Sequence, residues 1–131
     1  MTWAIGIIVV FLAVLAIGVV LRLKSSPKLS GASQRKLQAA WQHARSLQDP
    51  HRKILECDKV LDLLLSELGY QGSLGDKLRK AGKYIPSVQD VWNAHKLRNR
   101  IAHEPGTQVS AQEALGASRA FEAVIAKYVS L

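Results

Sequence analysis

The chain has 131 residues, 48% of them hydrophobic, and 18 lysines and arginines against 10 acidic residues give a formal net charge of +8. This length fits one small domain with an appendage. The sequence contains no Walker A loop, no G-x-G-x-x-G and no G-x-S-x-G motif, which excludes the phosphate-loop, dinucleotide-binding and serine-hydrolase classes that carry them. Cys57 is the single cysteine, so no intramolecular disulfide can form; among apolar helical neighbours its thiol fits a packed position better than a nucleophile.

The first predicted element is a membrane helix. Residues 3–21 read WAIGIIVVFLAVLAIGVVL, without a charged side chain. As a helix this run is about 28 Å long, close to the hydrocarbon core of a bilayer at about 30 Å. A buried core helix is disfavoured because every face is apolar, and a cleaved signal peptide because a basic n-region and a clear cleavage site are missing. We therefore expect residues 1–23 to form an uncleaved transmembrane anchor.

A basic juxtamembrane linker is expected at residues 24–32, where Pro27, Gly31 and several serines discourage regular structure. Basic residues without any acid follow the apolar run, whereas only the α-amino group precedes it. The positive-inside bias then places the N-terminus outside and residues 22–131 in the cytoplasm, at the inner (cytoplasmic) membrane. Anionic lipid head groups are the simplest partner of these charges, and RNA is a second possibility. The residues expected at the membrane surface are Arg22, Lys24, Lys28, Arg35 and Lys36.

The remaining chain is predicted to fold as an all-α, four- to five-helix bundle, because apolar residues recur at helical spacing and no segment shows sustained strand alternation. Pro50 suits the first turn of a helix. Ser73, Ser87 and Ser110 are each followed three residues later by an acidic residue, a pattern typical of capping boxes. The expected helices span residues 33–47, 50–68, 74–83, 88–104 and 111–129.

The helix at 88–104 carries polar side chains on the side that its apolar residues mark as packed. Unpaired polar groups are costly in a core. This side is therefore either a network paired with acids elsewhere in the bundle, for example Asp58, Asp62 or Glu67, or a functional site. At 100° per residue it comprises Val88, Val91, Trp92, His95, Asn99 and Ala102, with Arg98 and His103 at its borders.

The segment Arg98-Asn99-x-x-x-His103 resembles the R-polar-x(n)-H motif of HEPN (higher eukaryotes and prokaryotes nucleotide-binding) domains. The resemblance extends to the all-α architecture and to the place of the motif near the end of a long helix, so it covers residues 33–131. The phrase W-x-x-H-x-x-R-N-x-x-x-H-E is also similar to small membrane-anchored bacterial proteins of unassigned function. Pro105 stands where many ribonuclease members have an aromatic residue, which leaves cleavage and non-catalytic binding both open.

If the resemblance extends to activity, it implies metal-independent RNA cleavage. His103 would serve as general acid or base on the ribose 2′-OH or the leaving oxygen, Arg98 would hold the scissile phosphate, and Asn99 would orient the phosphate or the histidine. The family typically builds this site across a dimer, so the resemblance also implies a homodimer formed through the bundle. Further candidates for binding contacts, outside the motif, are His95, Lys96 and Arg100.

The function predicted from these features is a membrane-anchored cytoplasmic HEPN-like module that dimerises and binds RNA, a nucleotide or a protein. A membrane-tethered endoribonuclease and a purely structural docking bundle are the alternatives. In the structural case Arg98 and Asn99 would bond to a neighbouring helix and His103 would cap its own helix end. No cofactor is implied, and no metal site is expected, because His95 and His103 lack a cysteine or acid at ligand spacing.

Overall fold

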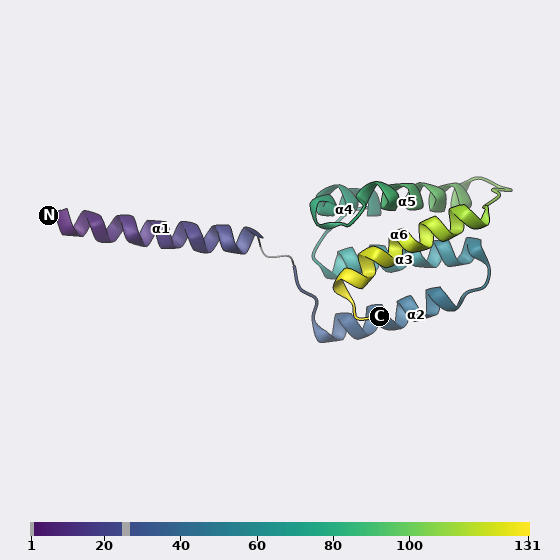
Figure 1. Cartoon of the computed structure of the whole chain (residues 1–131), viewed down its shortest axis with the longest axis horizontal. Coiled ribbons are helices and arrows are strands. Elements are labelled where there is room, and N and C mark those ends of the chain that lie inside the picture. Colours follow the sequence, from purple (N-terminus) through teal and green to yellow (C-terminus); the bar gives the residue numbers. More distant parts are fainter. Residues whose placement is uncertain (1, 25–26) are drawn as a thin grey trace.

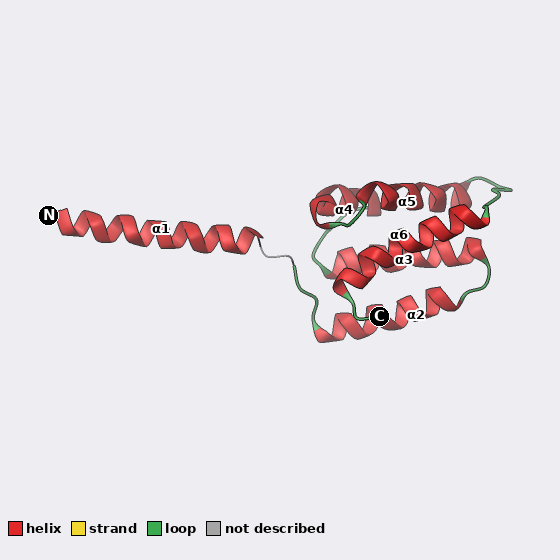
Figure 2. Cartoon of the chain, in the orientation of Figure 1, coloured by secondary structure: helices red, strands yellow, loops and turns green. Residues whose placement is uncertain are grey.

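The computed structural model describes the backbone of residues 2–24 and 27–131 and the side chains of residues 3–21 and 27–131. The predicted all-α class is confirmed: the regular structure of these residues is a long N-terminal helix followed by a helical bundle (Figures 1 and 2). The elements are α1 (Thr2–Lys24), α2 (Gly31–Ser46), α3 (Pro50–Glu67), α4 (Leu74–Ala81), the 3-10 turn η1 (Gly82–Tyr84), α5 (Val88–His103) and α6 (Ala111–Tyr128).

Helix α1 stands apart from the bundle (Figure 1), and none of its apolar run over residues 3–21 is buried. Among the described residues it is the one helix long and apolar enough to cross a membrane. An apolar helix that covers no core needs an apolar environment from elsewhere. The exposed helix is consistent with a membrane anchor or a signal sequence.

Most helix starts follow from local chemistry that the sequence displays. The capping boxes at Ser73 and Ser110 are both formed, with Asp76 and Glu113 returning the backbone bond. Helix α2 begins at Gly31, earlier than expected, because the Ser30 hydroxyl accepts from the Ser33 N–H at 3.1 Å.

The capping box predicted at Ser87 is wrong. Ser87 adopts φ +47° and ψ +50°, the left-handed region, and its side chain makes no capping bond. A capping hydroxyl needs the extended backbone that the other N-cap serines have. The Ser87 carbonyl instead accepts from Asp90 N at 2.9 Å and Val91 N at 3.3 Å, which starts α5 through its backbone.

Helix α3 lies at the centre of the bundle, because it packs against α2, α5 and α6 (Figure 1). Trp41 and Cys57 are buried in this core, which confirms the packed position that the sequence predicted for Cys57. The packed side of α5 differs from the prediction. Helix α5 contacts both α3 and α6, so its packed side faces two neighbouring helices and is centred on Val91, Ala94 and Leu97. Val91, Ala94 and Leu97 are the buried residues of α5, Val88 and Trp92 are half-buried, and Ala102 is exposed.

Candidate functional site

A buried carboxylate organises the polar side of α5. Asp58, in the middle of α3, is only 3% exposed. His95 Nδ1 lies 2.8 Å from Asp58 Oδ1, and Arg98 Nε lies 3.2 Å from Asp58 Oδ2. The Arg98 Nε–H forms no hydrogen bond within the described part of the chain, so its contact with Asp58 is an ion pair without hydrogen-bond alignment. Asp58 therefore ties α3 to α5 through two side chains.

Asn99 completes this cluster. Arg98 Nη1 donates to Asn99 Oδ1 at 3.0 Å, and Asn99 Nδ2 lies 3.4 Å from His95 Nε2. Because the Asn99 amide oxygen accepts from Arg98, the Asn99 amide nitrogen is the group that faces the imidazole. A carboxylate oxygen can only accept, so the His95 Nδ1–H donates to Asp58. We call Asp58, His95, Arg98 and Asn99 the Asp58 network.

The Asp58 network lines a cavity of about 470 Å³ between α3, α5 and the turn before α4. The side chain of Arg98 is 27% exposed, so its guanidinium reaches solvent. Trp92 packs edge-on beside His95, with ring centroids 6.2 Å apart, and touches the Gly75 side of α4. Of the predicted residues, the structure thus brings together Arg98, Asn99 and His95.

His103 lies outside the Asp58 network and its cavity. It is exposed at the last position of α5 and lines a separate cavity of about 370 Å³ with His51 and the loop after α5. Five residues after Arg98, it is turned about 140° around the helix axis. Within the described part of one chain, Arg98 and His103 line no common cavity.

Sequence reasoning missed His51. Its Nε2 lies 2.9 Å from the Thr107 carbonyl oxygen and its Nδ1 lies 3.5 Å from Asp49 Oδ1, which places the ring against the loop beside His103. The first turn of α3 and the end of α5 are far apart in the sequence, and no local pattern connects them. Only the tertiary packing brings the two histidines to one cavity.

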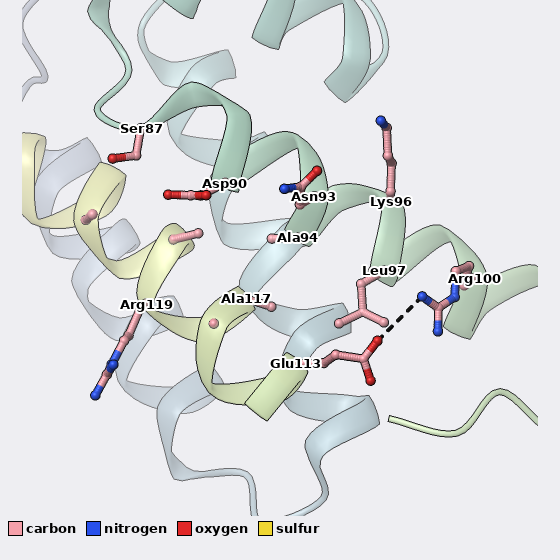
Figure 3. A pocket seen from close by; sticks show the side chains of 13 residues that line it. Ser87, Asp90, Asn93, Ala94, Lys96, Leu97, Arg100, Glu113, Ala117 and Arg119 are labelled. Atoms are coloured by element: carbon pink, nitrogen blue, oxygen red, sulfur yellow. Dashed lines mark ion pairs between the residues drawn. The ribbon is translucent and has the colours of Figure 1, made fainter. Parts of the chain in front are cut away.

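Lys96 and Arg100 line a third cavity, a groove of about 780 Å³ between α5 and α6 (Figure 3). Arg100 Nη1 lies 3.6 Å from Glu113 Oε1 across the end of this groove. Hydrogen bonds from the Ser110 backbone and hydroxyl are the main cause that lowers the pKa of Glu113. The groove is lined mostly by small residues and by charges of both signs: Ala94, Gly116, Ala117, Ala120, Ala123, Asp90, Lys96, Arg100, Glu113 and Arg119.

The predicted membrane-surface residues are only partly described. Lys28 and Arg35 are exposed. Lys36 is exposed too, but its Nζ lies 3.0 Å from Glu67 Oε1, so it also joins α2 to α3. The side chains of Arg22 and Lys24, at the end of α1, lie outside the described residues.

Cys57 is an inert thiol. It is buried, and burial raises its pKa to about 12. Because the thiolate is the nucleophile and the metal ligand, such a thiol is unreactive at neutral pH. No group of three or more His, Cys, Asp or Glu side chains is arranged to hold a metal ion among the residues that the structure describes.

Comparisons of the chain with family models, with curated proteins and with solved structures find no match. The resemblance to HEPN domains therefore rests on residues 98–103 and on the order of the helices.

Proposed function

We propose that the chain is a membrane-anchored, HEPN-like module that pairs with a second copy of itself through the groove between α5 and α6. The observation that carries this proposal is the composition of the groove. Its floor of alanines and Gly116 allows a second helix to approach closely, and its rim holds charges of both signs. Asp90, Lys96 and Arg119 have no ion-pair partner among the described residues, so they are available to another molecule.

The spacing of these charges suits a pair of identical helices. Asp90, Asn93 and Lys96 follow one another along α5 at the groove (Figure 3), and Asp90 and Lys96 are equally far from Asn93. If two α5 helices cross antiparallel at Asn93, Asp90 of each copy faces Lys96 of the other. A two-fold interface forms every contact twice, so one such match gives two ion pairs.

Membrane anchoring supports this pairing. We infer that α1 spans the inner membrane with its N-terminus outside, and that the bundle lies in the cytoplasm, because the basic residues follow the apolar run. Exposed Lys28 and Arg35 would face anionic lipid head groups. Two copies held in one membrane have a high effective concentration, so a modest interface is sufficient.

A charge-swap experiment tests the pairing. The full chain is reconstituted in lipid vesicles, and association is measured by energy transfer between fluorophores at the C-terminus. Asp90→Lys and Lys96→Asp should each abolish association, whereas the double swap restores both ion pairs and should restore it. Gln42→Lys and Gln42→Asp, at an exposed position of α2 outside every groove, serve as charge controls. Single swaps without effect, or a double swap that stays monomeric, would refute the antiparallel pair.

Orientation is tested separately with C-terminal reporter fusions. A fluorescent protein that folds only in the cytoplasm should be bright, and a phosphatase that is active only outside should be silent. The opposite pattern would place the bundle outside. A chain released from the membrane by cleavage after α1 would identify the helix as a signal sequence.

A second candidate, a membrane-tethered endoribonuclease, is favoured by one observation. His103 and His51 line the same exposed cavity, and two imidazoles can act as general acid and general base. RNA would reach this cavity along Lys96, Arg100 and His103, which are exposed at i, i+4 and i+7 on α5. The full chain is incubated with mixed RNA without metal. Cleavage that disappears in folded His103→Ala and His51→Ala variants would establish the enzyme, and no cleavage by the wild type would exclude it.

The pairing proposed above separates the two candidates. In an antiparallel crossing at Asn93, the two copies of His103 would lie about 30 Å apart along the helix axes. One shared cleft containing both copies of residues 98–103 would then not form. Pairing through the α5–α6 groove therefore favours the non-catalytic module.

A further inference from the structure

A fourth cavity, of about 530 Å³, lies between α2, α3 and α6 and shares no lining residue with the three described above. Its wall is mainly apolar and includes Trp41, Cys57, Ala114 and Leu115. Leu115 is 51% exposed, which is unusual for a large apolar side chain in this bundle. A volume of roughly 300–1,000 Å³ with an apolar wall and few polar groups is typical of small-molecule sites.

Trp41, which lines this cavity, carries a buried hydrogen-bond donor without an acceptor among the described residues. Its side chain is 2% exposed, and its indole Nε1 has no hydrogen-bond partner within the described part of the chain. Buried polar atoms in folded proteins are almost always paired. Because indole N–H can only donate, the missing partner has to be an acceptor atom. The cavity that Trp41 lines is therefore suited to a molecule that presents an oxygen.

The charges around the cavity favour a negative molecule. Lys53 lines the cavity and has no ion-pair partner among the described residues. Arg45 Nη1 is 3.7 Å from Glu122 Oε1, and both side chains are largely solvated, so this pair is weak and can rearrange. Among the described residues that line this cavity, one cation without an ion-pair partner and one loosely held cation lie beside a single acid.

We propose that this cavity binds a small amphipathic carboxylate, with its ring or short chain on Leu115 and Ala114, an oxygen accepting from Trp41 Nε1, and its charge balanced by Lys53. A single molecule of this kind satisfies the unpaired donor, the exposed apolar surface and the free cation together. The site is independent of the α5–α6 pairing, because it lies on other residues.

The test follows the indole N–H of Trp41 directly. The full chain, with ¹⁵N-labelled tryptophan, is placed in nanodiscs of zwitterionic lipid and titrated with 3-phenylpropionate. Trp41→Phe assigns the Trp41 signal among the three indole resonances, which belong to Trp3, Trp41 and Trp92. The Trp41 N–H proton should move downfield, because a hydrogen bond to a carboxylate deshields it, while the signals of Trp3 and Trp92 stay in place.

Three comparisons test the charge and the position. Lys53→Gln should weaken binding about two- to fivefold, the range of a partly solvated ion pair. Lys59→Gln, on the same helix but outside this cavity, should leave it unchanged. The neutral alcohol 3-phenyl-1-propanol should bind more weakly than the carboxylate.

Three outcomes would overturn the proposal. The first is a Trp41 signal that stays in place up to about 10 mM probe, well above the roughly millimolar affinity expected of so small a ligand. The second is an equal response to the neutral alcohol, which would remove the case for an anion. The third is an equal shift of all three indole signals, which would indicate partitioning into lipid.

Discussion

The Asp58 network makes a sharp prediction for the substitution Asp58→Asn. The change keeps the size of the side chain and removes its charge. The oxygen facing His95 can still accept, but as a neutral acceptor, and a charge-assisted bond is about twice as strong as a neutral one. The other oxygen, 3.2 Å from Arg98 Nε, becomes an amide nitrogen, so that two donors face each other where Asp58 is 3% exposed.

The magnitude follows from these two losses. Weakening the 2.8 Å contact with His95 costs about 1 kcal/mol, and a buried donor without an acceptor costs about 1–3 kcal/mol. Arg98 is 27% exposed and regains water, which keeps its own loss below about 1 kcal/mol. We expect a loss of about 2–4 kcal/mol in the free energy of unfolding. For a bundle of about 100 residues this lowers Tm on the order of 10–20 °C.

The assay is thermal and urea unfolding of the full chain in nanodiscs, followed by circular dichroism. Glu56→Gln is the matched control, because it makes the same chemical change on α3 at a solvated ion pair with Lys59. It should cost less than about 0.5 kcal/mol. If Asp58→Asn costs no more than Glu56→Gln, the network does not hold α3 to α5. A double mutant with Arg98→Gln should be less destabilised than the sum of the singles, by about 1 kcal/mol, since it removes the facing donors.

Three further predictions concern other parts of the bundle. Ser87→Gly should raise stability by about 0.5–1 kcal/mol in urea unfolding, because Ser87 has φ +47° and glycine adopts left-handed φ without the steric cost; a drop would mean that the Ser87 side chain has a role in the fold. Cys57, with its pKa near 12, should react with iodoacetamide at pH 8 about a thousandfold more slowly in the folded chain than in urea, and rapid labelling of the folded chain would contradict its burial. The pKa of Glu113 is lowered in the folded chain, so this carboxylate stabilises the fold above its ordinary pKa of 4.5, and the stabilisation is lost as pH falls through the lowered pKa. Glu113→Gln removes this group, so the Tm of the variant should fall less than that of the wild type between about pH 5 and pH 3. Parallel pH curves for the two proteins would show that the Ser110 capping box contributes no pH dependence.

Local chemistry made most helices predictable. Pro50 and the boxes at Ser73 and Ser110 act within one helical turn, so their residue types are sufficient to indicate a helix start. Ser87 has the same pattern, but a cap also requires an extended backbone, and the tight turn after η1 imposes a left-handed one. Residue type alone does not determine φ and ψ.

Which acid of α3 pairs with the polar side of α5 depends on how the two helices are placed against each other in the fold. Three acids, Asp58, Asp62 and Glu67, were equally plausible partners for the polar side of α5. The fold uses Asp62 to hold buried Lys77, at 2.7 Å, and Glu67 to bind Ser33 and Lys36 on α2. Asp58 is the acid of these three that pairs with α5. Asp62 lies one turn further along nearly the same side of α3 and pairs with α4, and Glu67 lies on the opposite side and pairs with α2, so the partner of α5 depends on how far each helix is shifted along α3. The cavities between helices have no sequence signal for the same reason.

The contacts of the Arg98 side chain bear on the function of the segment that resembles the HEPN motif, residues 98–103. A catalytic arginine needs its N–H groups directed at a phosphate. Here Arg98 Nε faces the Asp58 carboxylate and Nη1 donates to Asn99, so a phosphate at this position would meet a buried negative charge. Asp58→Asn removes that charge and leaves Arg98 in place. If Arg98 were a phosphate ligand held back by Asp58, this variant would bind RNA more tightly than the wild type. If the network serves to join α3 and α5, the variant loses stability and gains no affinity for RNA, which is the result we expect from a bundle whose open groove lies on the other side of α5.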